Sequence, residues 1–333
     1  MSTLRVAVLG GGRSSEHEVS LASAASVSEG LQEAGHEVSM VRIGADGVWR
    51  RDGQEILLEP GRGFEDSEVV FPVLHGPFGE DGTVQGLLEC LGVPYVGAGV
   101  LASALCMDKV MFKHLMAHEG VPQVSYETVT EQQMRAEPET TLARLGALGL
   151  PVFVKPARLG SSVGIVRVAT ADELEPALRT AFAHDQLAIV EAFADGLEVE
   201  CSVIGNDEPI ASEPGEIMLA SGESGWYDYE AKYTPGGMQL VVPARLPGHV
   251  RERIRELAVG TFVCSGCSGL ARVDFFVSGE EVLVNELNTM PGFTSTSVFA
   301  SLFAASGISY VELLDRLLAL ALDRHAEEER HRH

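Results

Sequence analysis

Positive charge is scarce in this sequence. Its 333 residues include 24 Lys and Arg against 48 Asp and Glu, which gives a formal net charge of −24 at pH 7. Nucleic acids and anionic membrane surfaces are bound through Lys and Arg side chains, so a chain this acidic would be repelled by both. We therefore expect a small-molecule substrate, with no nucleic acid and no membrane as partner. An anionic substrate would need a local basic pocket.

Cysteine is also rare, and long apolar runs are missing. The five cysteines are odd in number and scattered, so they predict no disulfide framework. Cys264 and Cys267 form a single C-x-x-C pair without nearby histidines, which favours buried thiols over zinc or redox chemistry. No stretch reaches the roughly 18 apolar residues of a membrane span, and no signal-peptide pattern opens the chain. We expect a cytoplasmic protein.

The order of expected strands and helices predicts an α/β (α+β) protein. Residues 1–105 alternate apolar strands with helices, as in an open parallel α/β domain. Residues 106–195 predict a small α+β unit, and residues 196–325 predict paired strands followed by helices. Residues 326–333 are a charged tail that we expect to fray.

Three local predictions are specific enough to test. Ser15 and Glu18 have the spacing of a capping box at the start of the first helix. A single strand is expected near residues 210–217. The last helix is expected over residues 310–322, with the charged residues from Asp323 onward frayed.

One strand pair near the C-terminus carries a candidate metal site. Arg272 and Asp274 lie two residues apart, as do Glu286 and Asn288, and side chains two apart share one face of a strand. A turn at Gly279 predicts a hairpin that would bring these faces together. Two carboxylates and an amide oxygen suit Mg²⁺ or Mn²⁺. A buried Arg–carboxylate pair is the alternative, but it would leave excess negative charge.

A glycine–serine loop and three lysines offer a place for phosphate. Lys155 ends an apolar strand and is followed by the segment 160–164, whose glycines let the backbone approach a ligand closely. Ser161 and Ser162 add hydroxyl donors to that loop. Lys109, Lys155 and Lys232 stand beside unusual motifs and together would make the basic pocket that ATP requires. An ordinary hairpin loop and surface lysines remain the alternative.

The N-terminal region holds two further polar segments. Gly10 to Gly12 follow a strand and resemble a dinucleotide-binding turn, but Ser15 stands where the third glycine of G-x-G-x-x-G belongs. Glu16 is suited to an ammonium group, or serves only as a first-turn acid favoured by the helix dipole. His75 follows a buried strand at the edge where α/β proteins bind ligands, and a turn histidine is equally consistent.

In this order, the motifs resemble the D-alanine–D-alanine ligase family of the ATP-grasp superfamily over almost the whole chain. The resemblance implies a three-domain ATP-grasp fold with an N-terminal open parallel α/β domain, and ATP held between the other two domains. The segments that carry it are 14–20, 75–82, 107–109, 155–164, 227–233 and 288–294.

The resemblance also implies how ATP and its metals are bound. The phosphates would contact Lys109 and Lys155, with Lys232 at the transferring γ-phosphate and Ser162 in the loop beside them. The adenine and ribose pocket would include Glu191, Ala194 and Glu198. Two Mg²⁺ or Mn²⁺ ions would be held by Asp274, Glu286 and Asn288.

For the amino-acid substrates, the resemblance implies a second set of roles. Glu16 would hold the ammonium of the first D-alanine, supported by Ser161 and Tyr233, with His75 near that subsite. Arg272 and the Gly292 N–H would stabilise the oxyanion. Ser297 would hold the carboxylate of the second D-alanine.

The implied reaction passes through an acyl phosphate and yields D-alanyl-D-alanine, a precursor of peptidoglycan. Residues 220–237, rich in glycine and tyrosine, are the candidate lid that would exclude water. The intact segment 227–233 favours D-alanine over D-serine or D-lactate as second substrate. The family resemblance suggests a homodimer. An NAD-dependent oxidoreductase and an inactive ATP-binding regulator remain alternatives from other classes.

Overall fold

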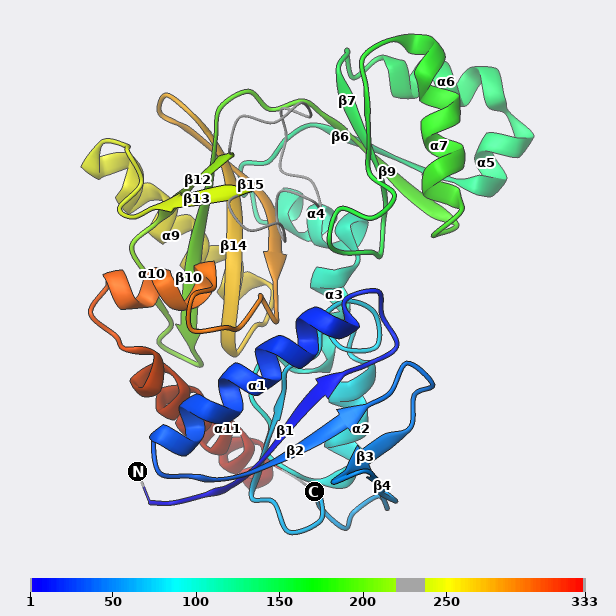
Figure 1. The fold of residues 1–333 in the computed structure, drawn as a ribbon. Helices are drawn as coiled ribbons and strands as arrows, with labels where there is room; N and C mark the ends of the chain where they lie inside the picture. The colour runs from blue at the N-terminus through cyan, green and yellow to red at the C-terminus, as the bar shows by residue number, and fades with distance from the viewer. Residues whose placement is uncertain (1, 220–236, 332–333) are drawn as a thin grey trace.

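Three β-sheets and the helices packed on them make up the molecule. The computed structural model describes residues 2–219 and 237–331. Figure 1 shows the N-terminal sheet at the bottom, a small central sheet at the upper right, and the C-terminal sheet at the upper left. The mixed α/β class expected from the sequence is confirmed.

The N-terminal sheet has the order β4-β3-β2-β1-β5. Its parallel centre consists of β1 (Arg5–Gly11), β2 (Glu37–Ile43) and β5 (Val69–Pro72), and its antiparallel edge of β3 (Trp49–Arg51) and β4 (Gln54–Glu55). Helix α1 (His17–Glu33) covers one face and α2 (Thr83–Leu91) the other; α3 (Val100–Met107) follows. Both faces of β1 are therefore buried, which explains its apolar run.

The predicted capping box at the start of α1 is wrong. The helix begins at His17, Glu16 is its N-cap residue, and no side chain caps it. Ser14 Oγ instead accepts from the Glu16 N–H at 3.2 Å and donates to the His75 carbonyl at 2.6 Å. The serine that organises this turn is thus one residue earlier than expected.

The central sheet is antiparallel throughout, with the order β6-β9-β7-β8. Its strands are β6 (Tyr126–Thr130), β7 (Val152–Pro156), β8 (Val166–Val168) and β9 (Leu187–Ala192). Its helices are α5 (Glu131–Ala136), α6 (Pro138–Gly146) and α7 (Leu174–Phe182), the last preceded by the 3-10 turn η1 (Ala171–Glu173). Helix α4 (Lys109–His118), which precedes this sheet, is capped by Asp108, whose side chain accepts from two backbone N–H groups.

The C-terminal sheet is also antiparallel, with the order β13-β12-β10-β14-β15 and β11 beside β10. Its strands are β10 (Leu197–Gly205), β11 (Ile210–Ala211), β12 (Gly215–Leu219), β13 (Met238–Val241), β14 (Gly269–Ser278) and β15 (Glu281–Asn288). Helices α9 (Gly248–Cys264) and α10 (Val298–Ala305) pack against it. The single strand expected at residues 210–217 is two strands, because Pro214 between them has no N–H to continue a ladder.

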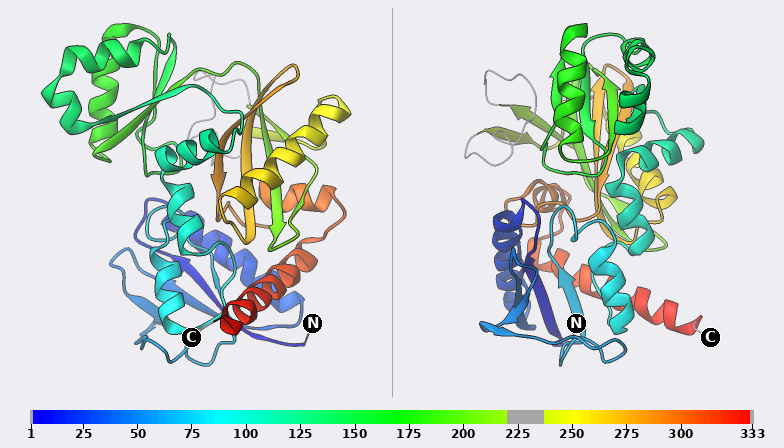
Figure 2. Two further views of the ribbon diagram at one scale, coloured as in Figure 1. Left: turned by 180° about the vertical axis from the view of Figure 1, so that it is seen from behind. Right: turned by 90° about the vertical axis from the view of Figure 1, so that its right-hand side faces the viewer.

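The last helix, α11 (Tyr310–Arg330), continues well past its predicted end. The residues from Asp323 to Arg330 are helical, so the expected frayed tail is wrong over this stretch. Arg324 explains the difference: it donates to the Tyr95 carbonyl at 3.1 Å and to Ser268 Oγ at 2.8 Å, and it lies 4.3 Å from the Tyr95 ring centroid. Figure 2 shows α11 lying against the N-terminal elements.

Packing joins the N-terminal and C-terminal sheets. One hydrophobic core contains Val8 and Phe71 of the N-terminal sheet, Leu270 of the C-terminal sheet, and Leu314 and Leu317 of α11. Segments more than 200 residues apart in the sequence are therefore fixed relative to one another.

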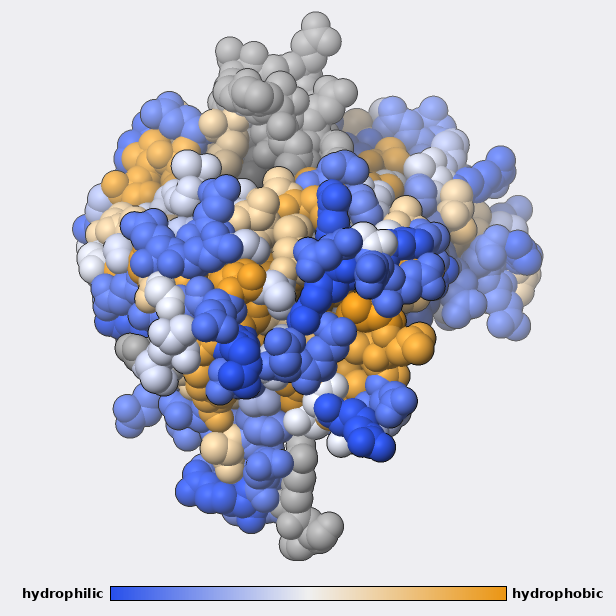
Figure 3. Space-filling view, turned by 60° about the horizontal axis from the view of Figure 1, so that its bottom comes forward, coloured by the Kyte–Doolittle hydropathy of each residue, from blue (hydrophilic) through white to orange (hydrophobic). Residues whose placement is uncertain are grey.

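Polar and charged residues dominate one face of the molecule. The face shown in Figure 3 is mainly hydrophilic, with apolar residues in separate islands. Among the described residues, no single helix is long and apolar enough to cross a membrane; α10 and α11 meet that test only as a pair bent by 103°.

Candidate active site

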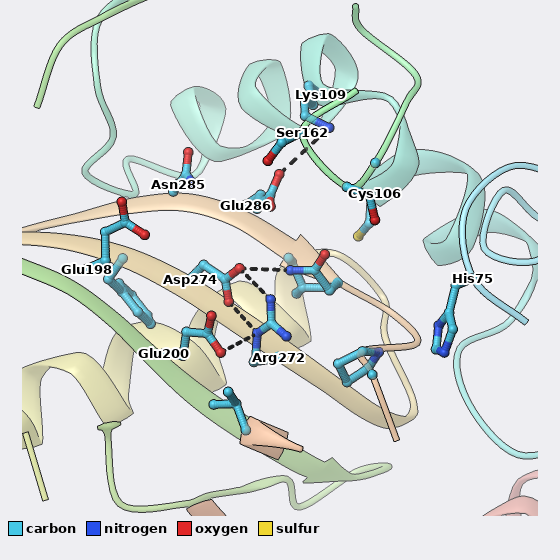
Figure 4. A pocket seen from close by; sticks show the side chains of 18 of the residues that line it. His75, Cys106, Lys109, Ser162, Glu198, Glu200, Arg272, Asp274, Asn285 and Glu286 are labelled. Atoms are coloured by element: carbon cyan, nitrogen blue, oxygen red, sulfur yellow. Dashed lines mark hydrogen bonds and ion pairs between the residues drawn. The ribbon is translucent and has the colours of Figure 1, made fainter. Parts of the chain in front are cut away.

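A cavity of about 710 Å³ is lined by residues from the N-terminal, central and C-terminal regions of the molecule. All the predicted site residues that lie in the described part of the chain line this cavity: Glu16, His75, Lys109, Lys155, Ser161, Ser162, Glu191, Ala194, Glu198, Arg272, Asp274, Glu286, Asn288, Gly292 and Ser297. Lys232, Tyr233 and nearly all of the candidate lid, 220–237, lie outside the described residues. Figure 4 shows part of the cavity wall.

The hairpin of β14 and β15 forms one wall, as its sequence predicted. Arg272 is in register with Asn288, and Asp274 with Glu286. Along β14, the side chains facing the cavity alternate with fully buried ones that pack on the helices behind the sheet. The two polar pairs therefore lie on the same face.

A β-bulge makes this arrangement possible. Glu286 pairs with Asp274 but Val284 pairs with Phe275, which leaves Asn285 as an extra residue on β15. Before the bulge, the even-numbered residues of β15, such as Val284, are buried in the core. After the bulge, the odd-numbered Leu287 is buried instead. Without the extra residue, Glu286 would face the core.

Arg272 is held rigidly by carboxylates. Its Nε and Nη2 donate to the two oxygens of Asp274 at 2.7 and 2.8 Å, and its Nε lies 2.9 Å from Glu200 Oε2. Asn288 Nδ2 donates to Asp274 Oδ2 at 3.0 Å. Figure 4 shows Glu200, Arg272 and Asp274 converging beside the cavity. A guanidinium fixed by two carboxylates is a preorganised positive charge.

The lysines on the opposite side of the cavity bind carboxylates too. Lys109 Nζ donates to the Leu159 carbonyl at 2.8 Å and lies 3.7 Å from Glu286 Oε2. Lys155 Nζ lies 2.5 Å from Glu191 Oε2. Burial lowers the pKa of Lys155, but Glu191 and Glu286 outweigh it and raise that pKa above its ordinary value. Lys155 is therefore a permanent cation.

The loop after β7 carries unusual backbone. Ser161 and Ser162 have φ of 51° and 58°, in the left-handed region that side chains rarely adopt. The Ser161 hydroxyl donates to Glu16 Oε1, which links this loop to the N-terminal region. A glycine is favoured at position 76, beside Glu16, because its φ of 72° lies in the left-handed region that other residues rarely adopt.

His75 is buried and uses both ring nitrogens within the protein. Its Nδ1 lies 3.0 Å from the Met290 carbonyl, and its Nε2 lies 3.1 Å from Ser23 Oγ. A carbonyl only accepts, so Nδ1 carries the proton and Nε2 accepts from the serine. Burial lowers the pKa of His75, although the nearby Glu16 carboxylate opposes this. The imidazole is therefore neutral at pH 7.

Glu80 lines the same cavity and was not predicted as a site residue. Its two oxygens accept from the backbone N–H groups of Gly76 at 2.8 Å and Met290 at 3.2 Å. Burial and the Glu16 carboxylate raise the pKa of Glu80 to about 8. The two N–H donors and the Arg272 cation lower this pKa, but they do not outweigh burial. Its long-range partner, Met290, gave no signal in the local sequence.

Two other residues missing from the prediction did have a sequence signal. Lys113 stands four residues after Lys109 on α4, on the same side of the helix, and binds Glu191 at 2.9 Å. Glu200 stands two residues after Glu198 on β10, so it shares a face with it and reaches Arg272. Both follow from helix and strand periodicity.

The acidic groups decide which ligands fit. The acidic residues lining the cavity are Glu16, Glu80, Glu191, Asp195, Glu198, Glu200, Asp274 and Glu286, and the cations are Lys109, Lys155 and Arg272. Glu80, whose pKa is raised to about 8, is largely neutral at pH 7, but the other acidic groups still outnumber the cations. A polyphosphate would add more negative charge, so this cavity suits it only together with metal cations. Within the described residues, no group of three His, Cys, Asp or Glu forms a complete metal site. Two carboxylates and an amide instead suit Mg²⁺ that shares its coordination with substrate phosphates.

The turn at Gly10 to Gly12 is occupied by the protein itself. The Gly11 N–H donates to Ser20 Oγ at 2.9 Å, and the Gly12 N–H donates to the Ile43 carbonyl at 2.8 Å. These donors are not available to a pyrophosphate. The geometry thus disfavours the dinucleotide-binding alternative.

The two thiols of the C-x-x-C pair are packed within the protein. Cys267 is buried, Cys264 is half-buried, and both thiols are free. Burial raises the pKa of Cys264 to about 11, so its thiolate is scarce at pH 7. The preferred interpretation as structural thiols agrees with this packing.

Family models and relatives agree on one type of protein. Residues 115–319 match the model described as the C-terminus of D-ala D-ala ligase, and residues 5–60 and 51–98 match that of its N-terminus. A D-alanine–D-alanine ligase from Solibacter usitatus is 48% identical over 328 residues, covering 98% of each chain. Another from Deinococcus radiodurans is 46% identical over 337 residues, covering 96% of this chain and 98% of its own.

Solved structures show the same similarity. The D-alanine-D-alanine ligase from Coxiella burnetii superposes with a TM-score of 0.87 at 34% identity, covering 99% of this chain and 97% of its own. The VanG D-Ala:D-Ser ligase from Enterococcus faecalis superposes with a TM-score of 0.86 at 36% identity, covering 96% of this chain and all of its own. The fold is thus similar to ligases with different second substrates.

Proposed function

Because the chain belongs to the D-alanine–D-alanine ligase family, we propose that its central cavity is where ATP drives the joining of two D-alanines. The chain is an ATP-dependent ligase, and its dipeptide product serves peptidoglycan synthesis. One observation supports the location: the polar face around Arg272 and Asp274 lines the same cavity as Lys109 and Lys155 from the neighbouring region.

ATP lies between the central and C-terminal sheets in this proposal. Lys109 and Lys155 bind its phosphates, with Ser162 beside them and Lys232 at the γ-phosphate. Glu191, Ala194 and Glu198 border the adenine and ribose. Phe153 and Phe193, whose rings stack with centroids 6.3 Å apart, line the same part of the cavity and offer an apolar wall to the base.

In this proposal, Asp274, Glu286 and Asn288 would hold two Mg²⁺ or Mn²⁺ ions. The excess of carboxylates in the cavity and the all-oxygen donor set support this assignment. When bound, such ions offset the charge on the transferring phosphoryl group. Lys109 Nζ lies 3.7 Å from Glu286 Oε2 and so offsets part of the negative charge on this side of the cavity.

The first D-alanine lies between the N-terminal region and the glycine–serine loop. Glu16 binds its ammonium group and is held in place by Ser161; Tyr233, which lies outside the described residues, would support Glu16 on the family resemblance. The hydrogen bond from Ser161 to Glu16 supports this arrangement, because it fixes a carboxylate that is only 7% exposed. The substrate carboxylate then attacks the γ-phosphorus of ATP, which gives D-alanyl phosphate and ADP.

The second D-alanine reacts with this acyl phosphate. Ser297, the N-cap residue of α10, binds its carboxylate beside the positive end of the helix dipole. Its amine attacks the carbonyl carbon, phosphate leaves, and the attacking nitrogen loses a proton. Arg272 and the Gly292 N–H stabilise the oxyanion formed on the way, and the rigid binding of Arg272 supports that role.

Three finer features also belong to the proposal. The candidate lid, residues 220–237, lies almost wholly outside the described residues; on the family resemblance it would exclude water from the acyl phosphate. D-Alanine is preferred as second substrate, on the basis of the segment 227–233. The family resemblance is the basis for expecting a cytoplasmic homodimer.

Phosphate release from ATP tests the proposed function. The purified protein is assayed with D-alanine, with L-alanine and without amino acid, and the dipeptide is measured in parallel. We expect release to depend on D-alanine, with one phosphate formed per dipeptide. Folded protein that releases no phosphate in response to D-alanine would refute the proposal.

A further inference from the structure

The segment between β15 and α10, residues 289–297, is held by side chains that lie far away in the sequence. Met290 is held on both sides of its backbone. Its N–H donates to Glu80 Oε2 at 3.2 Å, and its carbonyl accepts from His75 Nδ1 at 3.0 Å. These partners are 210 and 215 positions away. Side chains of the N-terminal region thus hold in place the segment that follows β15.

Helix α1 holds the next part of the segment. Ser23 Oγ accepts from the Phe293 N–H at 3.3 Å, and Ser26 Oγ accepts from the Ser295 N–H at 3.1 Å. Ser23 is 1% exposed and its hydroxyl also bonds to His75 Nε2 at 3.1 Å. The helix and the His75 loop are therefore parts of one hydrogen-bonded network.

Gly292 lies between the anchored residues and differs from them. It lines the cavity, and among the residues the structure describes no group accepts from its N–H. Pro291 beside it has no N–H at all. The backbone donors on either side, Met290 and Phe293, are both bound by side chains. Between the two bound N–H groups of Met290 and Phe293, the N–H of Gly292 is thus the one remaining backbone donor, and it belongs to a residue that lines the cavity.

We propose that Ser23, Ser26, His75 and Glu80 form an anchor that positions the Gly292 N–H for the attack of the second amine. The inference rests on the proposed role of Gly292 as an oxyanion donor. The anchor residues are positioning residues, because they act through the backbone of residues 290–295. A donor stabilises an oxyanion well only if it is held in place before the charge develops.

The order of the two chemical steps makes the anchor testable. The oxyanion forms only after D-alanyl phosphate has been made, so a loosened Gly292 would slow amine attack without slowing phosphoryl transfer. The waiting acyl phosphate would react with water instead and give D-alanine and phosphate. If the anchor is lost, we therefore expect more than one phosphate to be released per dipeptide. A general loss of folded protein would not change this ratio.

A matched pair of serine variants on α1 provides the test. Ser26→Ala removes the acceptor for the Ser295 N–H. Ser28→Ala makes the same change two residues away, where the half-buried hydroxyl donates only to the Ala24 carbonyl of the same helix at 2.8 Å. Glu80→Gln is a third variant, in which an amide NH₂ that cannot accept from N–H replaces one carboxylate oxygen.

Phosphate and dipeptide are measured side by side in the full-length protein. Misplacing a catalytic group by about 1 Å can cost about 100-fold, so we expect Ser26→Ala and Glu80→Gln to lower kcat for dipeptide about tenfold or more. The KM for ATP should stay within about twofold of wild type, and the phosphate-to-dipeptide ratio should exceed one. Ser28→Ala should keep wild-type kcat and a ratio of one.

Two results would overturn the anchor. One is a ratio of one in both Ser26→Ala and Glu80→Gln while the wild-type protein makes dipeptide. The other is an equal change in kcat and in the phosphate-to-dipeptide ratio for Ser28→Ala. That result would mean that the effect comes from altering helix α1 and not from losing its contact with residues 290–295. Wild-type protein that makes no dipeptide would instead refute the proposed function itself, so the two failures are distinguishable.

Discussion

Glu191 stabilises the protein through two buried ion pairs, and its replacement by glutamine should be costly. The residue is 3% exposed, and its carboxylate lies 2.9 Å from Lys113 Nζ and 2.5 Å from Lys155 Nζ. Burial would raise its pKa, but the two ammonium groups outweigh burial and lower the pKa of Glu191 from 4.5 to about 2. At ~1.4 kcal/mol per pH unit, this fall corresponds to about 3–4 kcal/mol of stability.

The pH dependence has a definite sign. Because the folded pKa is depressed, the stabilisation is complete above the unfolded value of 4.5 and is lost as the pH falls towards about 2. Glu191→Gln should therefore lower the free energy of unfolding by about 3–5 kcal/mol at pH 7, because it leaves two buried lysines without their carboxylate. The difference between wild type and variant should shrink as the pH falls from 5 to about 3.

Urea unfolding followed by circular dichroism at several pH values measures this difference. Glu127→Gln is the control, since Glu127 on the neighbouring strand β6 pairs with Arg144 at the surface. That exposed pair should contribute less than about 1 kcal/mol. A Glu191→Gln effect that is below 1 kcal/mol at pH 7, or that does not change with pH, would refute the reasoning.

Three further predictions concern the last helix, the metals and the second substrate. Arg324→Ala should lower the free energy of unfolding by about 2–3 kcal/mol in urea titrations, because its hydrogen bonds to Tyr95 and Ser268 are lost; an unchanged midpoint would contradict this. EDTA should abolish D-alanine-dependent phosphate release and Mg²⁺ or Mn²⁺ should restore it, so release that survives chelation would exclude the metal proposal. With equal D-alanine and D-serine, mass spectrometry should find mainly D-alanyl-D-alanine; a dominant D-alanyl-D-serine product would reverse the assigned preference.

The parts of the site that were predictable follow from local periodicity. Alternation along a strand was enough to place Arg272 with Asp274, and Glu286 with Asn288, on shared faces, and the register of β14 with β15 joins them. The family resemblance extended this to residues from the N-terminal and central regions that line the same cavity. Spacing alone contained no information about those distant contacts.

The parts that were missed depend on long-range contacts or on small irregularities. The bulge at Asn285 has no marker in the sequence, yet it decides which way Glu286 faces. In the sequence, the residues from Asp323 onward form a run of charges typical of a solvated tail, whereas in the fold Arg324 binds Tyr95 and Ser268, which are distant in the sequence. Glu80 was overlooked as a site residue because its partner Met290 is 210 positions away.

The replacement of Glu286 by glutamine tests the central claim most directly. The claim is that the face formed by Asp274, Glu286 and Asn288 serves the reaction and not only the packing of the hairpin. Glu281→Gln, at the exposed start of the same strand, is the matched control. We predict that Glu286→Gln lowers D-alanine-dependent phosphate release about 100-fold or more while the free energy of unfolding changes by less than about 1 kcal/mol. Turnover of Glu286→Gln at the wild-type rate would contradict the claim.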